Sequence, residues 1–162
     1  MTVTALKDEL LLPEIMRIEN ASFSPPWSEK SVETELISDD TVFLAALENE
    51  TKLLGFVIAK CAFDEAELYQ IAVAPECRRN GYADALMKAL FTELKKHGTE
   101  RLFLEVRKSN LPAVSLYEKY GFAALCVRKN YYTAPVEDAL IMEKRLDPEP
   151  ESSGAAKGEE RP

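Results

Sequence analysis

Two apolar runs, each followed by a helical segment, most constrain what this chain can fold into. The run at 68–74 stops at Pro75 and leads into a segment at 81–97 with leucines at helical spacing. The run at 101–106 leads into a second helical segment, begun by Ser109 or Asn110 and closed by Gly121. Together with the strands that precede them, these units predict an α+β or mixed α/β sheet with helices on both faces.

The rest of the chain supplies the other elements. Apolar residues recur at helical spacing in 8–23, with Pro13 in the first turn, and Ser28 is the expected N-cap of a helix that ends near Ser38. Further strands are expected at 2–6, 41–48, 53–63, 122–132 and 138–146. The predicted sheet therefore has about seven strands.

The length suits one domain with a sizeable core, which we place at residues 1–146. Residues 147–162 are rich in Pro, Glu, Gly and Ser with almost nothing to bury, and are predicted to form a disordered acidic tail. The net charge of −8 argues against direct nucleic-acid binding, which needs basic surface. It is compatible with a basic partner, although surplus acids more often serve solubility.

Cysteine spacing and the N-terminus bear on the compartment. Cys61, Cys77 and Cys126 form no C-x-x-C pair, so neither a disulfide framework nor a metal site is expected. The first residues lack the pattern of a secretory signal, and no apolar run approaches the roughly 20 residues that span a bilayer. These features predict a cytoplasmic protein with no membrane partner.

The first candidate site is the turn at 78–84, RRNGYAD, which opens the helical segment at 81–97. A helix N-terminus carries unpaired N–H groups and partial positive charge, and a small residue lets a ligand approach the backbone. Arg78 and Arg79 add full positive charge. Alone, the pattern is explained by a solvated turn with nothing bound, but its place after a strand and at the start of a helix is the one that a bound phosphate group requires. The glycine spacing of other phosphate-binding loops is absent.

The second candidate site is built on Glu105 and Tyr117. Glu105 lies near the end of an otherwise apolar strand, so its carboxylate is in solvent, paired with an arginine, or turned into a cleft that raises its pKa. Tyr117 follows Asn110 by two helical turns and lies on nearly the same face. The alternative for Tyr117 is a tyrosine that only packs in the core.

Several of these strings resemble those of a known superfamily. R-x-x-G-x-A at 78–83 resembles the acetyl-CoA signature of the GNAT N-acetyltransferases. Within that superfamily, the chain is similar to the RimI family of ribosomal-protein-alanine N-acetyltransferases in PWS (26–28), LEVRKSN (104–110), LYEKYGF (116–122) and RKNYY (128–132). The similarity runs from about residue 10 to residue 146, in the same order.

The resemblance implies the GNAT fold and acetyl-CoA as the cosubstrate. In this fold the fourth and fifth strands are parallel and splay apart, and here they would be the runs at 68–74 and 101–106. The implied contacts of acetyl-CoA are Ile71, Ala72, Val73, Arg78, Arg79, Asn80, Gly81, Tyr82, Ala83, Asp84 and Asn110. Asp84 is an ordinary first-turn acid, but beside a diphosphate its charge would slightly weaken binding.

The resemblance also implies the catalytic groups. Glu105 is the expected general base, working through water, and Tyr117 is the expected acid that protonates the departing thiolate. The backbone N–H of Val73 is the expected oxyanion donor. Glu67 and Tyr69 are the reserve candidates for the base or for a substrate contact.

The implied acceptor is the N-terminal alanine of a basic ribosomal protein. Its α-amino group has a pKa near 8, so it needs a weaker base than a lysine near 10.4. The expected substrate contacts are Trp27, Tyr131 and Tyr132, and the last two are equally well explained as strand residues. Acids such as Glu35, Glu67 and Asp138 are candidates for holding a basic peptide.

Two other functions remain open on the sequence. A GNAT enzyme for small-molecule amines would share the cofactor half of the domain, but the strings LEVRKSN and RKNYY disfavour it. A non-catalytic acyl-CoA sensor is disfavoured by the presence of Glu105 and Tyr117. The oligomeric state is left open, and a monomer is compatible with the sequence.

Overall fold

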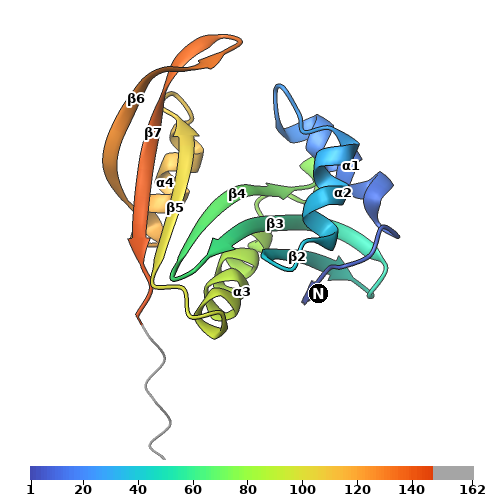
Figure 1. Cartoon of the computed structure of the whole chain (residues 1–162). Helices are drawn as coiled ribbons and strands as arrows, with labels where there is room; N and C mark the ends of the chain where they lie inside the picture. Colours follow the sequence, from blue (N-terminus) through green and yellow to red (C-terminus); the bar gives the residue numbers. More distant parts are fainter. Residues whose placement is uncertain (148–162) are drawn as a thin grey trace, which may run out of the picture.

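The computed structural model describes residues 1–147 and contains a seven-stranded mixed sheet in the order β1-β2-β3-β4-β5-β7-β6 (Figure 1). Within it, β4 and β5 pair in parallel and the other neighbours pair antiparallel. The predicted fold class is therefore confirmed. The strands are β1 Thr2–Ala5, β2 Thr41–Glu48, β3 Lys52–Ala62, β4 Glu65–Val73, β5 Arg101–Arg107, β6 Ala123–Thr133 and β7 Val136–Arg145. The predicted tail lies, apart from Asp147, outside the described residues.

Helices cover both faces of the sheet, as predicted. Helices α1 (Leu12–Ser22) and α2 (Glu29–Ile37) lie on one face of β2–β4, and α3 (Tyr82–Lys96) lies on the other (Figure 1). Helix α4 (Leu111–Lys119) packs beside β5 and β7, and a short 3-10 helix, Pro75–Cys77, follows β4. The core consists of apolar side chains from both helix layers and the sheet, such as Ile18, Phe56 and Leu90, each fully buried.

Local chemistry fixes the helix ends close to the predicted positions. The Ser28 hydroxyl accepts a hydrogen bond from the Ser31 N–H at 3.1 Å, and the Asn110 side chain does the same for Ala113 at 3.3 Å. Gly121 follows α4 in the left-handed conformation, with φ +86°. Strand β4 begins at Glu65, three residues before the predicted run at 68–74. Alternating burial of Ala66 and Leu68 extends the strand through these acids.

The parallel pairing of β4 and β5 is short. Glu65–Leu68 pair with Arg101–Leu104, and beyond these residues the two strands diverge (Figure 1). On the other edge of β4, the register with β3 shifts from Ile58↔Gln70 to Ala59↔Leu68, so Tyr69 is the extra residue of a β-bulge. The bulge therefore falls where β4 leaves β5, and such bulges bend a strand and redirect its side chains.

The divergence leaves backbone amides of β4 without a strand partner. The Ala74 N–H donates to Leu54 O at 2.8 Å, on the β3 side. Because successive N–H groups of a strand point to opposite edges, the N–H groups of Val73 and Ile71 point toward the gap left by β5. Gly55 brings β3 close to this end of β4, since a Cβ there would lie 2.5 Å from Ala72 O. The last residues of β4 are thus held from the β3 side alone.

Candidate active site

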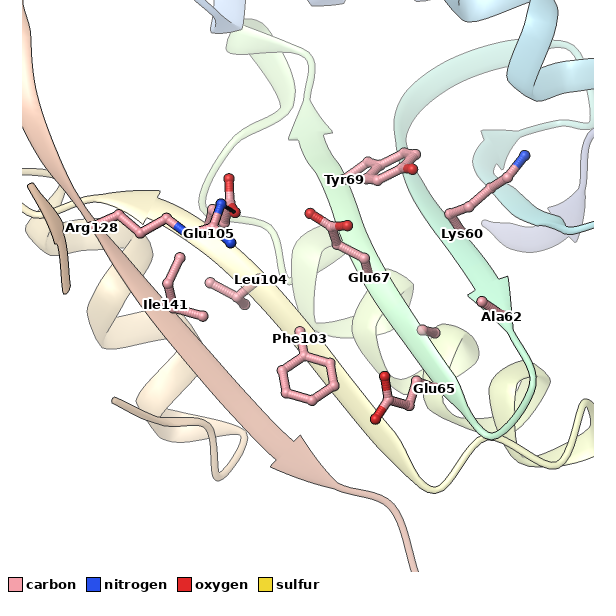
Figure 2. A pocket seen from close by; sticks show the side chains of 11 residues that line it. Lys60, Ala62, Glu65, Glu67, Tyr69, Phe103, Leu104, Glu105, Arg128 and Ile141 are labelled. Atoms are coloured by element: carbon pink, nitrogen blue, oxygen red, sulfur yellow. Dashed lines mark hydrogen bonds and ion pairs between the residues drawn. The ribbon is translucent and has the colours of Figure 1, made fainter. Parts of the chain in front are cut away.

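A cavity of about 380 Å³ lies over the paired segment of β4 and β5 and reaches the point where they diverge, and we call it the carboxylate cavity. Figure 2 shows Glu67 of β4 and Glu105 of β5 on opposite sides of the gap, both projecting into it. Glu105 occupies a half-buried position on the same strand face as Phe103. The cavity is lined by Lys60, Ala62, Glu65, Ala66, Glu67, Tyr69, Phe103, Leu104, Glu105, Arg128 and Ile141.

Most charged side chains of the carboxylate cavity are paired. The pairs are Glu105 with Arg128 (2.9 Å), Lys60 with Glu35 (3.3 Å) and Glu65 with Arg101 (3.0 Å). Within residues 1–147, Glu67 is the lining carboxylate without an ion pair. Burial raises the pKa of Glu67, the nearby Glu105 charge raises it further, and Arg128 opposes both. The cavity therefore offers one unneutralised acid to a cationic ligand.

The aromatic residues predicted to contact a substrate surround this cavity in two groups. Tyr69 lines it, and the Trp27 ring packs edge-on against Tyr69 with centroids 5.6 Å apart. On β6, Tyr131 and Tyr132 pack against each other at 5.1 Å, and the Arg128 guanidinium lies 5.6 Å from the Tyr131 ring centre. Interaction with the Glu105 carboxylate raises the pKa of the Tyr131 phenol, which places this ring beside the acid.

Tyr117 is buried on α4 and lines neither this cavity nor the one described next. Its ring packs edge-on against Phe122, with centroids 5.7 Å apart. Burial, with a smaller effect of Tyr132, raises the pKa of Tyr117 to about 12. The phenol is therefore neutral near pH 7, and its packing against Phe122 is what a core tyrosine shows.

A second cavity, of about 450 Å³, lies between the end of β4 and the N-terminus of α3, and we call it the arginine cavity. Ten of the eleven residues predicted to contact acetyl-CoA line it, namely Ile71, Ala72, Val73, Arg78, Arg79, Gly81, Tyr82, Ala83, Asp84 and Asn110. Asn80 does not, because its amide donates to the carbonyls of Cys77 and Arg78 and supports the turn. Ser22, Phe23, Pro112, Ala113 and Leu116 complete the lining.

The turn before α3 is built to expose positive potential. Gly81 is the N-cap at φ +79° and provides no side-chain cap, so the first N–H groups of α3 lack a side-chain acceptor. The Arg78 side chain already forms two hydrogen bonds within the protein. Its Nε donates to Val73 O at 3.2 Å, and its Nη2 donates to Ser22 Oγ at 3.3 Å. Arg79 is exposed at the cavity edge. These features together favour an anionic ligand over an empty turn.

The Asp84 charge is neutralised, which the sequence analysis did not foresee. Its carboxylate accepts hydrogen bonds from Lys119 Nζ at 2.7 Å and from the Tyr120 hydroxyl. Lys119, then Tyr120, lowers the pKa of Asp84. The expected repulsion between this acid and a diphosphate is therefore offset by a lysine that lies on a different helix.

Sequence reasoning missed the partners that organise the site. Arg128 belongs to the RKNYY string at 128–132. Its distance in sequence from Glu105 does not show that the two side chains, which lie on different strands, form an ion pair. Glu35 and Asp138 are engaged within the protein: Glu35 bonds Thr41 and Lys60, and Asp138 accepts the Asn130 N–H at 2.9 Å. Of the acids considered for a basic peptide, Glu67 is the one that lines a cavity unpaired.

The sheet is mixed, and its parallel pair opens between two cavities. One cavity lies at the arginine-bearing start of a helix, and the other is lined by carboxylates. This is the arrangement of an acyltransferase of the GNAT type. The sequence model of the Acetyltransferase (GNAT) family matches residues 12–122. The chain therefore belongs to the GNAT acetyltransferase family, which confirms the predicted resemblance.

Individual proteins and solved structures are similar to this chain over most of its length. The [ribosomal protein bS18]-alanine N-acetyltransferase of Escherichia coli (strain K12) is 40% identical over 133 residues, covering 81% of this chain and 88% of that protein. The crystal structure of the ribosomal-protein-S18-alanine N-acetyltransferase from Escherichia coli matches with a TM-score of 0.81 at 37% identity, over 93% of this chain and 97% of that one. An aminoglycoside 6'-N-acetyltransferase complexed with coenzyme A shares the fold at a TM-score of 0.79 and 17% identity, over 93% and 99% of the chains.

The protein is thus an acetyl-CoA-dependent N-acetyltransferase similar to the RimI enzymes. In the part of the chain that the structure describes, no group of three or more His, Cys, Asp or Glu side chains could hold a metal ion. No helix within residues 1–147 has the length and apolar character needed to cross a bilayer.

We predict that Gly81→Asp weakens acetyl-CoA binding at least tenfold, because it adds a side chain and a negative charge to the N-terminus of α3. Isothermal calorimetry measures the effect. Gly98→Asp is a matched control, since Gly98 has φ +75° and open space around it but follows the opposite end of α3. Equal affinity in the two folded variants would exclude the arginine cavity as the cofactor site.

Proposed function

We propose that this enzyme transfers acetyl from acetyl-CoA to the α-amino group of a protein N-terminus, with the N-terminal alanine of a basic ribosomal protein as its target in the cytoplasm. The observation that carries the proposal is the carboxylate cavity, where Glu67 and Glu105 face each other at the opening of the sheet. The names of the relatives support the choice of acceptor.

The arginine cavity has the chemistry that acetyl-CoA requires. Arg79 and the uncapped start of α3 suit the diphosphate, and the amides of Ile71 and Val73 that lack a strand partner suit an extended amide-bearing arm. When bound, acetyl-CoA supplies the acetyl group as a thioester. The direct attack of an amine then needs a base, an oxyanion donor and an outlet for the thiolate.

Glu105 is the proposed base. An α-ammonium with a pKa near 8 is already partly deprotonated near pH 7, so a carboxylate acting through water is sufficient. Arg128 holds the Glu105 carboxylate at 2.9 Å and fixes its orientation in the cavity. Since Arg128 is largely exposed, this pair orients the carboxylate without sealing it from an incoming amine.

The Val73 N–H and Tyr117 are the proposed partners of the thioester. The Val73 N–H points into the gap, where it can donate to the carbonyl oxygen as negative charge develops there. With a pKa of about 12, Tyr117 is a poor donor to a free thiolate near 8.5, and full transfer is uphill by about 5 kcal/mol. Its proton therefore moves only while the C–S bond breaks, or the thiolate leaves as an anion.

Glu67 is the proposed contact for a cationic acceptor. It is a half-buried carboxylate without an ion pair in the described chain, and a positive group from the substrate would compensate its desolvation. The aromatic surfaces of Trp27, Tyr69 and Tyr131 border the same opening and suit a peptide backbone. A small-molecule amine would use the acids but leave most of this aromatic border uncovered.

We expect Glu105→Gln to lower turnover by roughly two to four orders of magnitude, the usual size of a general-base effect, with little change in acetyl-CoA affinity. Steady-state kinetics and calorimetry measure the two quantities. The matched control is Glu143→Gln on β7. Glu143 also forms an ion pair with an arginine, Arg101, at 2.7 Å, but it does not line the cavity. Full activity of Glu105→Gln would make Glu105 a structural residue.

Tyr117→Phe should lower turnover less than Glu105→Gln does, because a phenol with a pKa of about 12 contributes only during bond breaking. The acetyl-CoA affinity of Tyr117→Phe, measured by calorimetry, is the control and should be unchanged, since Tyr117 lines neither cavity. A loss for Tyr117→Phe that matches or exceeds the loss for Glu105→Gln would contradict this limited role. No loss at all would leave Tyr117 as a core residue.

A peptide that starts with alanine and continues with basic residues should be acetylated once, at its α-amine. The same peptide with a blocked N-terminus and an internal lysine should not react, because a lysine is about two pKa units harder to deprotonate. Mass spectrometry distinguishes the products. Added salt should weaken binding of the basic peptide if Glu67 contributes. Equal transfer to the blocked peptide would refute the N-terminal specificity while leaving acetyl transfer intact.

A further inference from the structure

Glu19 of α1 is the one carboxyl-bearing residue that is fully buried within residues 1–147. Its Oε1 accepts two hydrogen bonds, from the Trp27 N–H at 2.6 Å and from the Gln70 side-chain amide at 2.9 Å. Neither donor is charged. A carboxylate enclosed in this way lacks the cationic partner that buried acids normally require.

Within the described residues 1–147, two buried oxygens next to these bonds have no hydrogen-bond partner, Glu19 Oε2 and Gln70 Oε1. They belong to side chains that are already joined by one hydrogen bond. Two acceptors cannot satisfy each other, but a proton on Glu19 Oε2 turns it into a donor that can serve Gln70 Oε1. A neutral acid facing a primary amide then forms two antiparallel hydrogen bonds, and both orphan oxygens are satisfied.

The electrostatic setting is consistent with a neutral acid. Burial raises the pKa of Glu19, while the bonds from Trp27 and Gln70 lower it less. These two groups are the polar neighbours that act on the carboxyl, from the α1–α2 loop and from β4, and neither titrates.

This carboxyl joins three parts of the acceptor side of the molecule. Glu19 belongs to α1, Trp27 to the loop that leads into α2, and Gln70 to β4, directly after the bulged Tyr69. The Trp27 ring in turn packs against Tyr69, which lines the carboxylate cavity. The loop therefore depends on Glu19 for its backbone anchor and on Tyr69 for its side-chain contact.

We propose that Glu19, as a neutral acid paired with Gln70, is a positioning residue that fixes the α1–α2 loop to β4 and so sets Trp27 and Tyr69 for acceptor binding. The assignment of Trp27 and Tyr69 to the acceptor side rests on the proposed function. The hydrogen-bonded pairing of Glu19 with Gln70 does not depend on the proposed function.

Kinetics test the positioning role. Glu19→Ala should raise the KM for the acceptor peptide at least tenfold and leave the Kd for acetyl-CoA unchanged. Glu19→Gln should stay within about twofold of wild type, because its amide can donate to Gln70 Oε1 in place of the proton. Leu94→Ala, in a fully buried position on α3, is the control for general destabilisation and should leave the acceptor KM unaltered. The same KM increase in Leu94→Ala, or in Glu19→Gln, would overturn the proposal.

The pH dependence of unfolding tests the neutral acid without any substrate, so its outcome is independent of which amine the enzyme acetylates. The pKa of Glu19 is raised on folding, so above the unfolded value near 4.3 the wild type must take up a proton to fold. Its stability relative to Glu19→Gln should therefore fall as pH rises from 5, by up to tenfold in the folding constant per pH unit. Denaturant titrations of both proteins between pH 5 and 8 measure this difference. A difference that is constant with pH would mean an ionised Glu19 and would overturn the proposal.

Discussion

The short parallel pairing of β4 and β5 is the constraint on which the rest of the structure depends. A parallel ladder normally uses the N–H and C=O groups on both edges of a strand. Here the ladder stops after Glu65–Leu68, and the following amides of β4 have no strand beside them on that edge. Unpaired backbone groups are costly when buried, so this edge must meet water or a ligand. The two cavities lie along it, one lined by acids and one by arginines.

The two cavities differ in the charge that they present to a ligand, although the chain is acidic overall. In the carboxylate cavity, arginine and lysine pairs neutralise most of the acids, and among residues 1–147 Glu67 has no ion-pair partner. In the arginine cavity, Lys119 neutralises Asp84, so the positive end of α3 is not cancelled. The net charge of the chain therefore says little about either site, because local pairing determines the sign that a ligand meets.

Much of this arrangement was predictable from sequence, for definable reasons. Periodicity and caps placed the helices, because Ser28, Asn110 and Gly121 act within a few residues of their own positions. The family resemblance named eleven residues as acetyl-CoA contacts, and ten of them line one cavity. Residues that act across the fold were not predictable. Arg128, Lys119 and Glu19 reach partners 23, 35 and 51 positions away, and no local pattern encodes such pairs.

The bond between Asp84 and Lys119 has a mechanical consequence. Helix α3 follows β4 and α4 follows β5, so this ion pair bridges the two halves of the sheet beyond the point where their backbones separate. Both side chains are partly exposed, and such pairs contribute at most about 1 kcal/mol and weaken as salt rises. The packing of Phe91 on Tyr120 and Phe122 joins the same two halves, so the ion pair adds to an apolar contact where the backbone ladder has ended. Salt therefore weakens the ionic part of this connection and leaves the apolar part in place.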